Sequence, residues 1–367
     1  MSDADSGLRH CRRLRIGYSA WGFLGGGVLD TPDGSRSYRR ELLDAITAAG
    51  HQVVWLQRNR DLHEVGVDLS RWYWFHAGLP DLDAVLLEWR WPLLGRNTTA
   101  CGSAGHTCDL HRQQEILDHY TIASGVPTVI WDLDRQLPAD DPLRRRPNVR
   151  VAEHALRPTP GAATVTCPVP DDLLDRADPT ELAAQSRPTP LVYVGNQYDR
   201  DDAFDHYFAP AAAAIAHRVA GKWPRTQAWP HVRFTGRCRF EDVARIHARA
   251  LATVLLLPER YRTVGHQTSR LFEAVTQGCL PLTPVDTVDA DRFTPTELHV
   301  RDAADVLAAL DRIQRIAGSQ EHADLIDACL SRLEPYRLSR QTVILLDLVH
   351  TLAARRSAGV PTDRKPL

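Results

Sequence analysis

Short apolar runs alternate with amphipathic segments along the whole chain, a pattern typical of parallel sheets built from βαβ units. In the first half, the predicted strands are residues 13–19, 52–56, 83–88, 127–131, 149–152 and 163–167. The predicted helices are residues 35–49 and 109–124. Gly50 and Gly125 directly follow these helices, and glycine accepts the left-handed conformation that often ends a helix.

The second half repeats this alternation after a segment rich in proline and aspartate. Its predicted strands are residues 191–194, 232–235, 252–257 and 280–283, and its predicted helices are residues 204–219, 240–250, 268–277, 303–316, 320–333 and 339–354. Proline and aspartate interrupt regular structure, so residues 169–189 are expected to link two domains. The sequence therefore predicts an α/β protein with Rossmann-like domains at residues 13–168 and 190–337.

The most informative motif is the predicted helix at residues 268–277, which Gly278 ends before an apolar strand. Arg270 and Glu273 are three residues apart, so both side chains lie on one helical face. A guanidinium opposes phosphate charge, and a carboxylate accepts hydrogen bonds from ribose hydroxyls. This pair predicts a site for a nucleotide diphosphate.

Other polar residues are expected at the same site because ligands of open α/β sheets bind beyond the carboxyl ends of the strands. Arginines there would neutralise a leaving diphosphate, so no metal ligand and no cofactor is assigned. The expected donor-binding residues besides the helical pair are Gly195, Asn196, Tyr198, Arg200, Arg237, His266, Thr268 and Ser269.

These motifs resemble those of GT-B glycosyltransferases, specifically the CgeB or spore-maturation type. The first loop, residues 16–36, further resembles glycosyltransferases of actinobacterial phages, some of which modify pyrimidines in phage DNA. The resemblance implies two Rossmann-like domains facing a cleft, with a C-terminal helix at residues 338–355 crossing back to the first domain. It also implies transfer from a nucleotide sugar, expected to be UDP-linked, to a hydroxyl of a modified pyrimidine in DNA. A metabolite or polysaccharide acceptor, or a sugar-nucleotide-binding protein without turnover, is the alternative.

Two groups of aspartates are candidates for the general base. Asp30 and Asp33 lie in the glycine-rich first loop, where Gly25 and Gly26 would let the backbone approach a substrate. That loop lacks the Gly-x-Gly-x-x-Gly dinucleotide fingerprint, and residues 31–34 also suit a type I turn. Asp132 and Asp134 end an apolar strand, where they would face the acceptor or simply cap the strand end or pair with Arg135.

Tryptophans and arginines of the first half are candidates for acceptor binding. Alternating positions on a strand put Trp89 and Trp91 on one face, which suits a stacking platform or ordinary core packing. Arg144 and Arg145 belong to a basic run that would contact phosphates or remain solvated.

Two cysteines and two histidines occur within residues 101–111. Zinc is one interpretation, but the spacing is not a usual finger spacing. The favoured interpretation is a loop-to-helix junction capped by Thr107 or Asp109.

Composition describes an ordinary globular chain with 367 residues, 43% hydrophobic residues and a net charge of −2. The small net charge restricts any DNA contact to a local patch. Seven scattered cysteines are not a disulfide framework. No apolar run approaches the roughly 20 residues of a membrane span, and the first residues are acidic. We therefore expect no membrane contact and a cytoplasmic location, the host cytoplasm if a phage encodes the protein.

Overall fold

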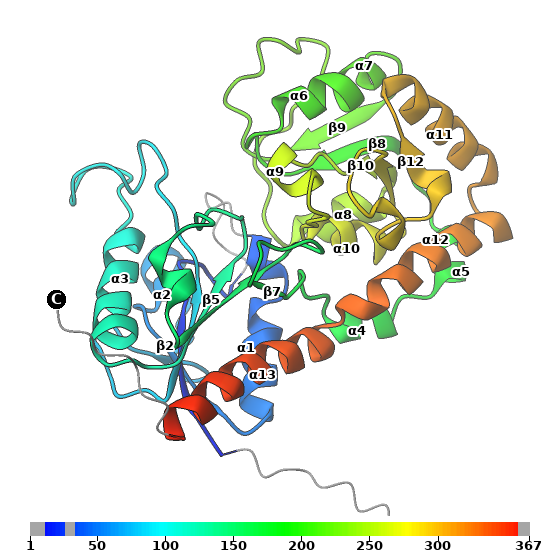
Figure 1. The fold of residues 1–367 in the computed structure, drawn as a ribbon. Coiled ribbons are helices and arrows are strands. Elements are labelled where there is room, and N and C mark those ends of the chain that lie inside the picture. Colours follow the sequence, from blue (N-terminus) through cyan, green and yellow to red (C-terminus); the bar gives the residue numbers. More distant parts are fainter. Residues whose placement is uncertain (1–11, 26–33, 359–367) are drawn as a thin grey trace, which may run out of the picture.

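The computed structural model describes residues 12–25 and 34–358, which form two parallel sheets side by side (Figure 1). The first sheet has the order β3-β2-β1-β4-β5-β6-β7. All its strand pairs are parallel, as the alternating pattern predicted. Its strands are β1 (Arg15–Ser19), β2 (Gln52–Trp55), β3 (Trp74–Phe75), β4 (Ala84–Glu88), β5 (Thr128–Asp132), β6 (Val149–Glu153) and β7 (Ala163–Thr164).

The second sheet has the order β12-β11-β10-β8-β9 and is also parallel. The chain leaves β8 for β9 on one side and returns to β10 on the other. The strand order therefore reverses between β8 and β10, which is where open α/β sheets bind ligands. The strands are β8 (Thr189–Val194), β9 (His217–Ala220), β10 (Ala250–Val254), β11 (Leu280–Pro284) and β12 (His299–Val300).

Amphipathic helices cover both sheets. In α1 (Arg39–Ala48), for example, Leu42, Leu43 and Ile46 are buried, while Arg40 and Glu41 are exposed. The other α-helices are α2 (Arg60–Val65), α3 (Asp109–Ile116), α4 (Asp171–Asp175), α5 (Pro179–Ala184), α6 (Asp201–Ala203), α7 (Ala209–Ala212), α8 (Asp242–Ala248), α9 (Glu259–Arg262), α10 (Arg270–Val275), α11 (Ala303–Ile316), α12 (Gln320–Leu333) and α13 (Leu338–Ser357). Among the described residues, no helix is both long and apolar enough to cross a bilayer.

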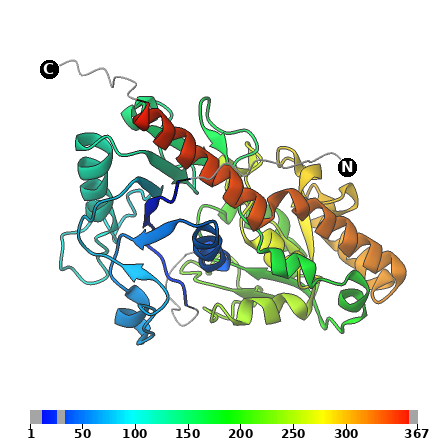
Figure 2. The same cartoon turned by 90° about the horizontal axis from the view of Figure 1, so that it is seen from below.

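The last helix crosses from the second sheet to the first, as expected. Helix α12 packs against α5, and α13 then packs against α1 and strands β4 to β6. Figures 1 and 2 show this orange-to-red passage beneath both sheets. Leu345, Val349 and Leu352 form the buried side of α13.

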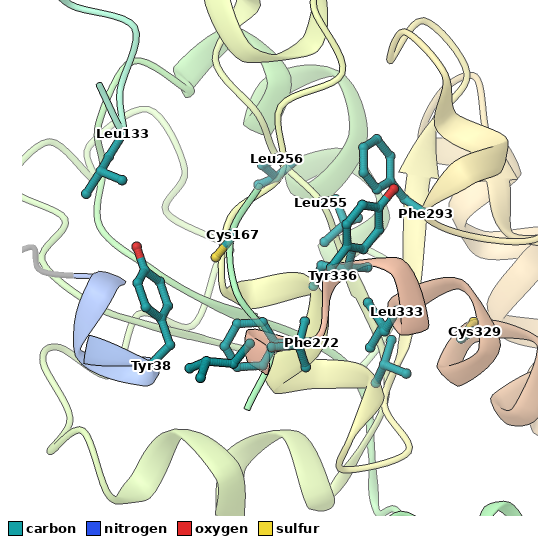
Figure 3. Packing of buried hydrophobic residues seen from close by; sticks show 14 of the residues in the cluster. Tyr38, Leu133, Cys167, Leu255, Leu256, Phe272, Phe293, Cys329, Leu333 and Tyr336 are labelled. Atoms are coloured by element: carbon teal, nitrogen blue, oxygen red, sulfur yellow. The ribbon is translucent and has the colours of Figure 1, made fainter. Parts of the chain in front are cut away.

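One hydrophobic core joins the two halves. At their junction, Cys167 from the first half packs near Phe272, Phe293, Leu333 and Tyr336 (Figure 3). The rings of Phe293 and Tyr336 are stacked with centroids 5.9 Å apart. The shared core holds the carboxyl edges of the two sheets close together.

Some predicted elements are wrong. The expected helix at residues 204–219 ends at Ala212, because residues 217–220 form β9 and pair with β8. The expected strand at residues 232–235 is only a single bridge between Val219 and Phe234. The short strands β3 and β12 and helix α2 were not predicted.

Candidate functional site

Arg270 is anchored at the end of β8. Its Nε donates to the Val194 carbonyl at 2.6 Å, and its guanidinium lies 4.6 Å above the Tyr193 ring. Gly195 permits this approach, because a Cβ there would overlap the guanidinium. Burial lowers the pKa of Arg270, and the positive charge of Arg200 acts in the same direction. Arg270 therefore presents a fixed, desolvated cation at the strand end.

Glu273 lies one turn further along α10 and contacts the other half of the chain. Ser37, in the 3₁₀ turn Gly34–Ser37, donates a short hydrogen bond to its carboxylate. Burial raises the pKa of Glu273. The pair Arg270 and Glu273 thus faces the junction of the two halves, where Thr268 is partly buried and Ser269 is buried.

The loop after β8 is held mainly by hydrogen bonds to the segments that follow β9 and β10. Trp223 Nε1 donates to the Gly195 carbonyl at 2.8 Å, and the Lys222 amide donates to Asn196 Oδ1 at 2.8 Å. Arg200 donates to the carbonyls of Leu256 and Asn196. Asn196 and Arg200 therefore shape the loop. Arg237 is exposed on the loop that follows the Phe234 bridge.

Tyr198 of this loop and Arg260 of α9 reach toward the first sheet. Trp91 Nε1 donates to the Tyr198 hydroxyl at 3.3 Å. Arg260 pairs with Asp199 at 2.6 Å and donates to the Asp134 carbonyl at 3.4 Å. An open hollow of about 690 Å³, lined partly by Arg200 and Arg260, lies at the carboxyl ends of β8, β10 and β11.

Asp134 and Asp132 have different surroundings although only one residue separates them. Asp132 accepts from the backbone amides of Gln136 and Leu137 at 2.9 and 2.8 Å, so it caps the turn after β5. Asp134 instead accepts a short hydrogen bond from the Tyr261 hydroxyl across the junction. Burial raises the pKa of Asp134, and it raises that of Asp132 to about 6. The expected pair with Arg135 is absent among the described contacts, because Arg135 pairs with Glu153 at 3.1 Å.

His266 completes the junction. Its ring stacks on Tyr261 with centroids 3.8 Å apart and lies 5.5 Å from the His154 ring. Burial lowers the pKa of His266 far below its usual range, so the ring is neutral. A neutral histidine offers a hydrogen bond but no positive charge for a phosphate.

Several buried polar atoms near the start of α10 have no hydrogen-bond partner among the described residues. Such orphaned groups are uncommon in protein interiors, so their concentration at one junction points to a polar ligand. They are Arg270 Nη1, Arg260 Nη2, Tyr193 Oη, His266 Nδ1 and both amide atoms of Gln267.

Three candidates of the first loop, Gly26, Asp30 and Asp33, lie outside the described residues. Gly25 is described, and its amide donates to Asp61 at 2.7 Å. Arg36, just after the loop, lies 4.9 Å from the Phe240 ring of the other half. Arg36 also donates to the Gly25 carbonyl at 3.0 Å, so the two ends of this loop lie close together beside the other half.

The chain is similar in fold to solved structures of glucosyltransferases. The T4 phage β-glucosyltransferase with its UDP-glucose substrate has a TM-score of 0.63 and 11% identity, over 91% of this chain and 99% of its own. An α-glucosyltransferase with UDP and a 13-mer DNA containing an A:G mismatch has a TM-score of 0.58 and 12% identity, over 92% and 99%. The chain has the GT-B fold. No family model and no curated protein sequence matches it.

Within the GT-B fold, the proposed acceptor residues are not gathered at one place. Strand β4 ends at Glu88, so Trp89 and Trp91 do not alternate on a strand. Trp89 packs on the core, whereas Trp91 reaches Tyr198. The expected shared face of the two tryptophans is therefore wrong.

Arg144 and Arg145 of the basic run also have different surroundings. Arg144 pairs with Glu153 at 2.9 Å and donates to the carbonyls of Leu137 and Pro138, whereas Arg145 is exposed. The contacts of Arg144 close the turn after β5, which leaves it poorly placed for a phosphate. Arg145 is the member of the pair that faces solvent.

A buried charged cluster at the carboxyl edge of the first sheet was missed in the sequence. Glu88 pairs with Arg39 at 2.9 Å, and both side chains are fully buried. Tyr18 donates a short hydrogen bond to Glu88, and Arg90 lies 3.4 Å from it. The available signal was a carboxylate at the end of the apolar run Ala84–Glu88, next to Arg90.

Proposed function

We propose that this protein is a glycosyltransferase that moves a sugar from a UDP-linked donor to a hydroxyl group on DNA. The observation that carries the proposal is the location of Arg270 and Glu273 at the junction of two GT-B halves. Beside them lie buried polar atoms that have no hydrogen-bond partner in residues 12–25 and 34–358. The neighbouring folds support the substrates, since they belong to enzymes solved with UDP-glucose or with DNA.

The donor nucleotide would bind the second half. Arg270 and Arg260 each have a buried nitrogen that finds no hydrogen-bond partner within the described part of the chain, and in this proposal these nitrogens bind the diphosphate. Glu273 would accept from ribose hydroxyls after exchanging its bond with Ser37. Fixed guanidinium groups stabilise negative charge as it develops on the leaving diphosphate. One similar structure contains UDP and Mn²⁺, but our assignment gives the charge to arginines of this chain.

Asp134 is the best placed general base. It lies at the carboxyl edge of the first sheet, faces the second half, and has a pKa raised by burial. A carboxylate with a raised pKa accepts a proton more readily near neutral pH. The acceptor oxygen would bond to the anomeric carbon, its proton would pass to Asp134, and the bond from that carbon to the diphosphate would break.

DNA is the proposed acceptor, and a hydroxylated pyrimidine is its most specific form. A hydroxyl carried on pyrimidine C5 projects into the major groove, where an enzyme reaches it without reading the whole base. A metabolite or polysaccharide acceptor would use the same donor site.

The test is incubation of the protein with nucleotide sugars and DNA containing ordinary or hydroxymethylated pyrimidines. Nucleosides from the digested DNA are then analysed by mass spectrometry. We expect a hexose or pentose mass increment on the hydroxylated nucleoside alone. Hydrolysis of the donor without any modified nucleoside would keep the donor site and remove the DNA acceptor. Absence of both binding and hydrolysis would remove the proposal.

A further inference from the structure

The long connection between β4 and α3 folds back on itself outside the hydrophobic core. Gly102 and Gly105 have φ values of 86° and 74°, which favour glycine. Two backbone hydrogen bonds, Ser103 to Ala100 and His106 to Ser103, form successive turns. In Figure 1 this cyan connection projects beyond α3. The turns bring residues around 101 close to the start of α3.

Four potential metal ligands meet there. The side chains of Cys101, His106, Cys108 and His111 each place a ligand atom within 4.8 Å of all the others. Cys101 Sγ and His111 Nδ1 are only 3.1 Å apart. Around a tetrahedral zinc ion, with Zn–S about 2.3 Å and Zn–N about 2.0 Å, ligand atoms lie roughly 3.3–3.8 Å apart. Shifts of about 1 Å would therefore complete the coordination shell.

His106 provides an independent indication. Its Nδ1 lies 3.2 Å from the Thr99 hydroxyl, whereas its Nε2 is buried without a partner among the described residues. Histidines that bind metals usually make a hydrogen bond through the other ring nitrogen, which fixes the ring orientation. His106 has this arrangement, with Nε2 left as the ligand atom.

Helix capping does not explain the cluster. Helix α3 begins after Cys108, and no side chain caps it. Thr107 donates to Asp109 at 2.9 Å instead, and Asp109 also accepts from Asn97. The expected Thr107 or Asp109 cap is therefore wrong, and the clustered thiols and imidazoles need another role.

We infer that Cys101, His106, Cys108 and His111 bind a structural Zn²⁺ ion. Two sulfur and two imidazole ligands in a tetrahedron suit zinc better than magnesium or calcium, which prefer oxygen. Binding releases the two thiol protons, and the two thiolates balance the charge of the ion. All four positions are taken by protein, as in sites that stabilise structure rather than react.

The ion would order a segment that contacts the other half of the molecule. Asn97 donates to the Trp91 carbonyl at 3.0 Å and to Asp109 at 3.3 Å, and Trp91 in turn reaches Tyr198. The zinc site therefore supports the position of Trp91. The inference depends on the four ligands and not on the proposed reaction.

The first measurement is metal content of the full chain, purified without chelator from zinc-supplemented medium. We expect one zinc per chain by mass spectrometry of metals, and at least a tenfold lower content in Cys108→Ser and His106→Ala. Cys238→Ser is the matched control, because Cys238 is half-buried and far from the four ligands in sequence; it should retain the metal.

A second measurement protects the test against variants that fail to fold. Wild-type protein loaded with Co²⁺ should show the visible absorption bands of a tetrahedral thiolate site, and added Zn²⁺ should remove them. Wild-type protein without stoichiometric zinc and without these bands would overturn the inference. So would a Cys101–Cys108 disulfide in peptides digested without reductant, since the thiolates would then be unavailable.

Discussion

Asp134 accepts a hydrogen bond from Tyr261, a residue 127 positions later in the chain and in the other half of the molecule. This contact places a carboxylate of the first sheet against the donor half. Its neighbour Asp132, on the same turn, contacts only backbone amides of its own loop among the described hydrogen bonds. The two aspartates therefore allow a matched test of catalysis against stability.

Asp134→Asn should reduce the rate of sugar transfer by a factor of at least about 100, within the 10²–10⁴ range of general-base contributions. Its affinity for UDP should be nearly unchanged. Asp132→Ala should instead lower the free energy of unfolding by about 1–3 kcal/mol, because the buried Leu137 amide and the partly buried Gln136 amide lose their acceptor. Transfer rates, calorimetric UDP titration and urea unfolding distinguish the two effects. Full activity in Asp134→Asn would exclude this residue as the base.

The donor site makes a second prediction. Glu273→Gln should weaken UDP binding about ten- to a hundredfold, because the loss of a charge-assisted hydrogen bond costs about 1.5–3 kcal/mol. Arg270→Lys should do the same by removing the planar guanidinium. Ser37→Ala is the control, since it removes only the partner of Glu273 in the unliganded protein. Calorimetry should show that Ser37→Ala binds UDP at least as tightly as the wild type. Unchanged UDP affinity in both Glu273→Gln and Arg270→Lys would contradict the donor assignment.

DNA binding should depend on Arg145 rather than Arg144. Arg145 is exposed, so Arg145→Ala should reduce the slope of log affinity against log salt by about one. Arg144→Ala should mainly lower stability, because Glu153 then loses a 2.9 Å ion pair inside the fold. Fluorescence anisotropy with labelled DNA at several salt concentrations measures the slope. An unaltered slope in Arg145→Ala would remove this residue from the DNA contact.

The junction should be sensitive to acid. Burial lowers the pKa of His154 to about 3, whereas an unfolded histidine titrates near 6.5. Between pH 6.5 and about 3, the unfolded chain binds a proton at this histidine that the folded protein does not bind. The free energy of unfolding is therefore highest above pH 6.5 and decreases as the pH falls toward 3.

Between pH 7 and pH 5 this histidine alone should lower the free energy of unfolding by about 2 kcal/mol. Urea unfolding should show a smaller decrease for His154→Gln than for wild type. The exposed His63→Gln variant should behave as wild type. Identical pH slopes for wild type and His154→Gln would contradict the prediction.

Local periodicity was sufficient to predict the parallel sheets, whereas the crossing of the last helix was expected from the resemblance to GT-B proteins. Helices α11 and α12 begin and end where their amphipathic patterns predict, because Asp302 and Ser319 cap them with side-chain hydrogen bonds. In these segments, sequence-local interactions agree with tertiary packing. The same agreement explains why the fold class was readable from one sequence.

The failures occurred where contacts distant in sequence decide the outcome. Glu273 finds Ser37 across 236 positions, which no helical pattern encodes. Asp132 and Asp134 differ because Asp132 is held by amides of its own turn, whereas Asp134 contacts Tyr261, 127 positions later. Arg144 looked like a phosphate ligand because its partner Glu153 lies nine positions later, at the end of β6. The alternation of side chains along a strand could not predict the directions of Trp89 and Trp91, because β4 ends at Glu88.

Because α13 packs on the first sheet, it affects the order in which the two halves can complete their cores during synthesis. Its buried residues Leu345, Val349 and Leu352 complete a domain whose first strand begins at Arg15. During synthesis that domain emerges first, yet its last helix leaves the ribosome only after the whole second half. The second half can therefore close its core earlier, although domains synthesised first generally fold first. The amino-terminal half would wait, with the surface that receives α13 uncovered, until the final segment of the chain arrives.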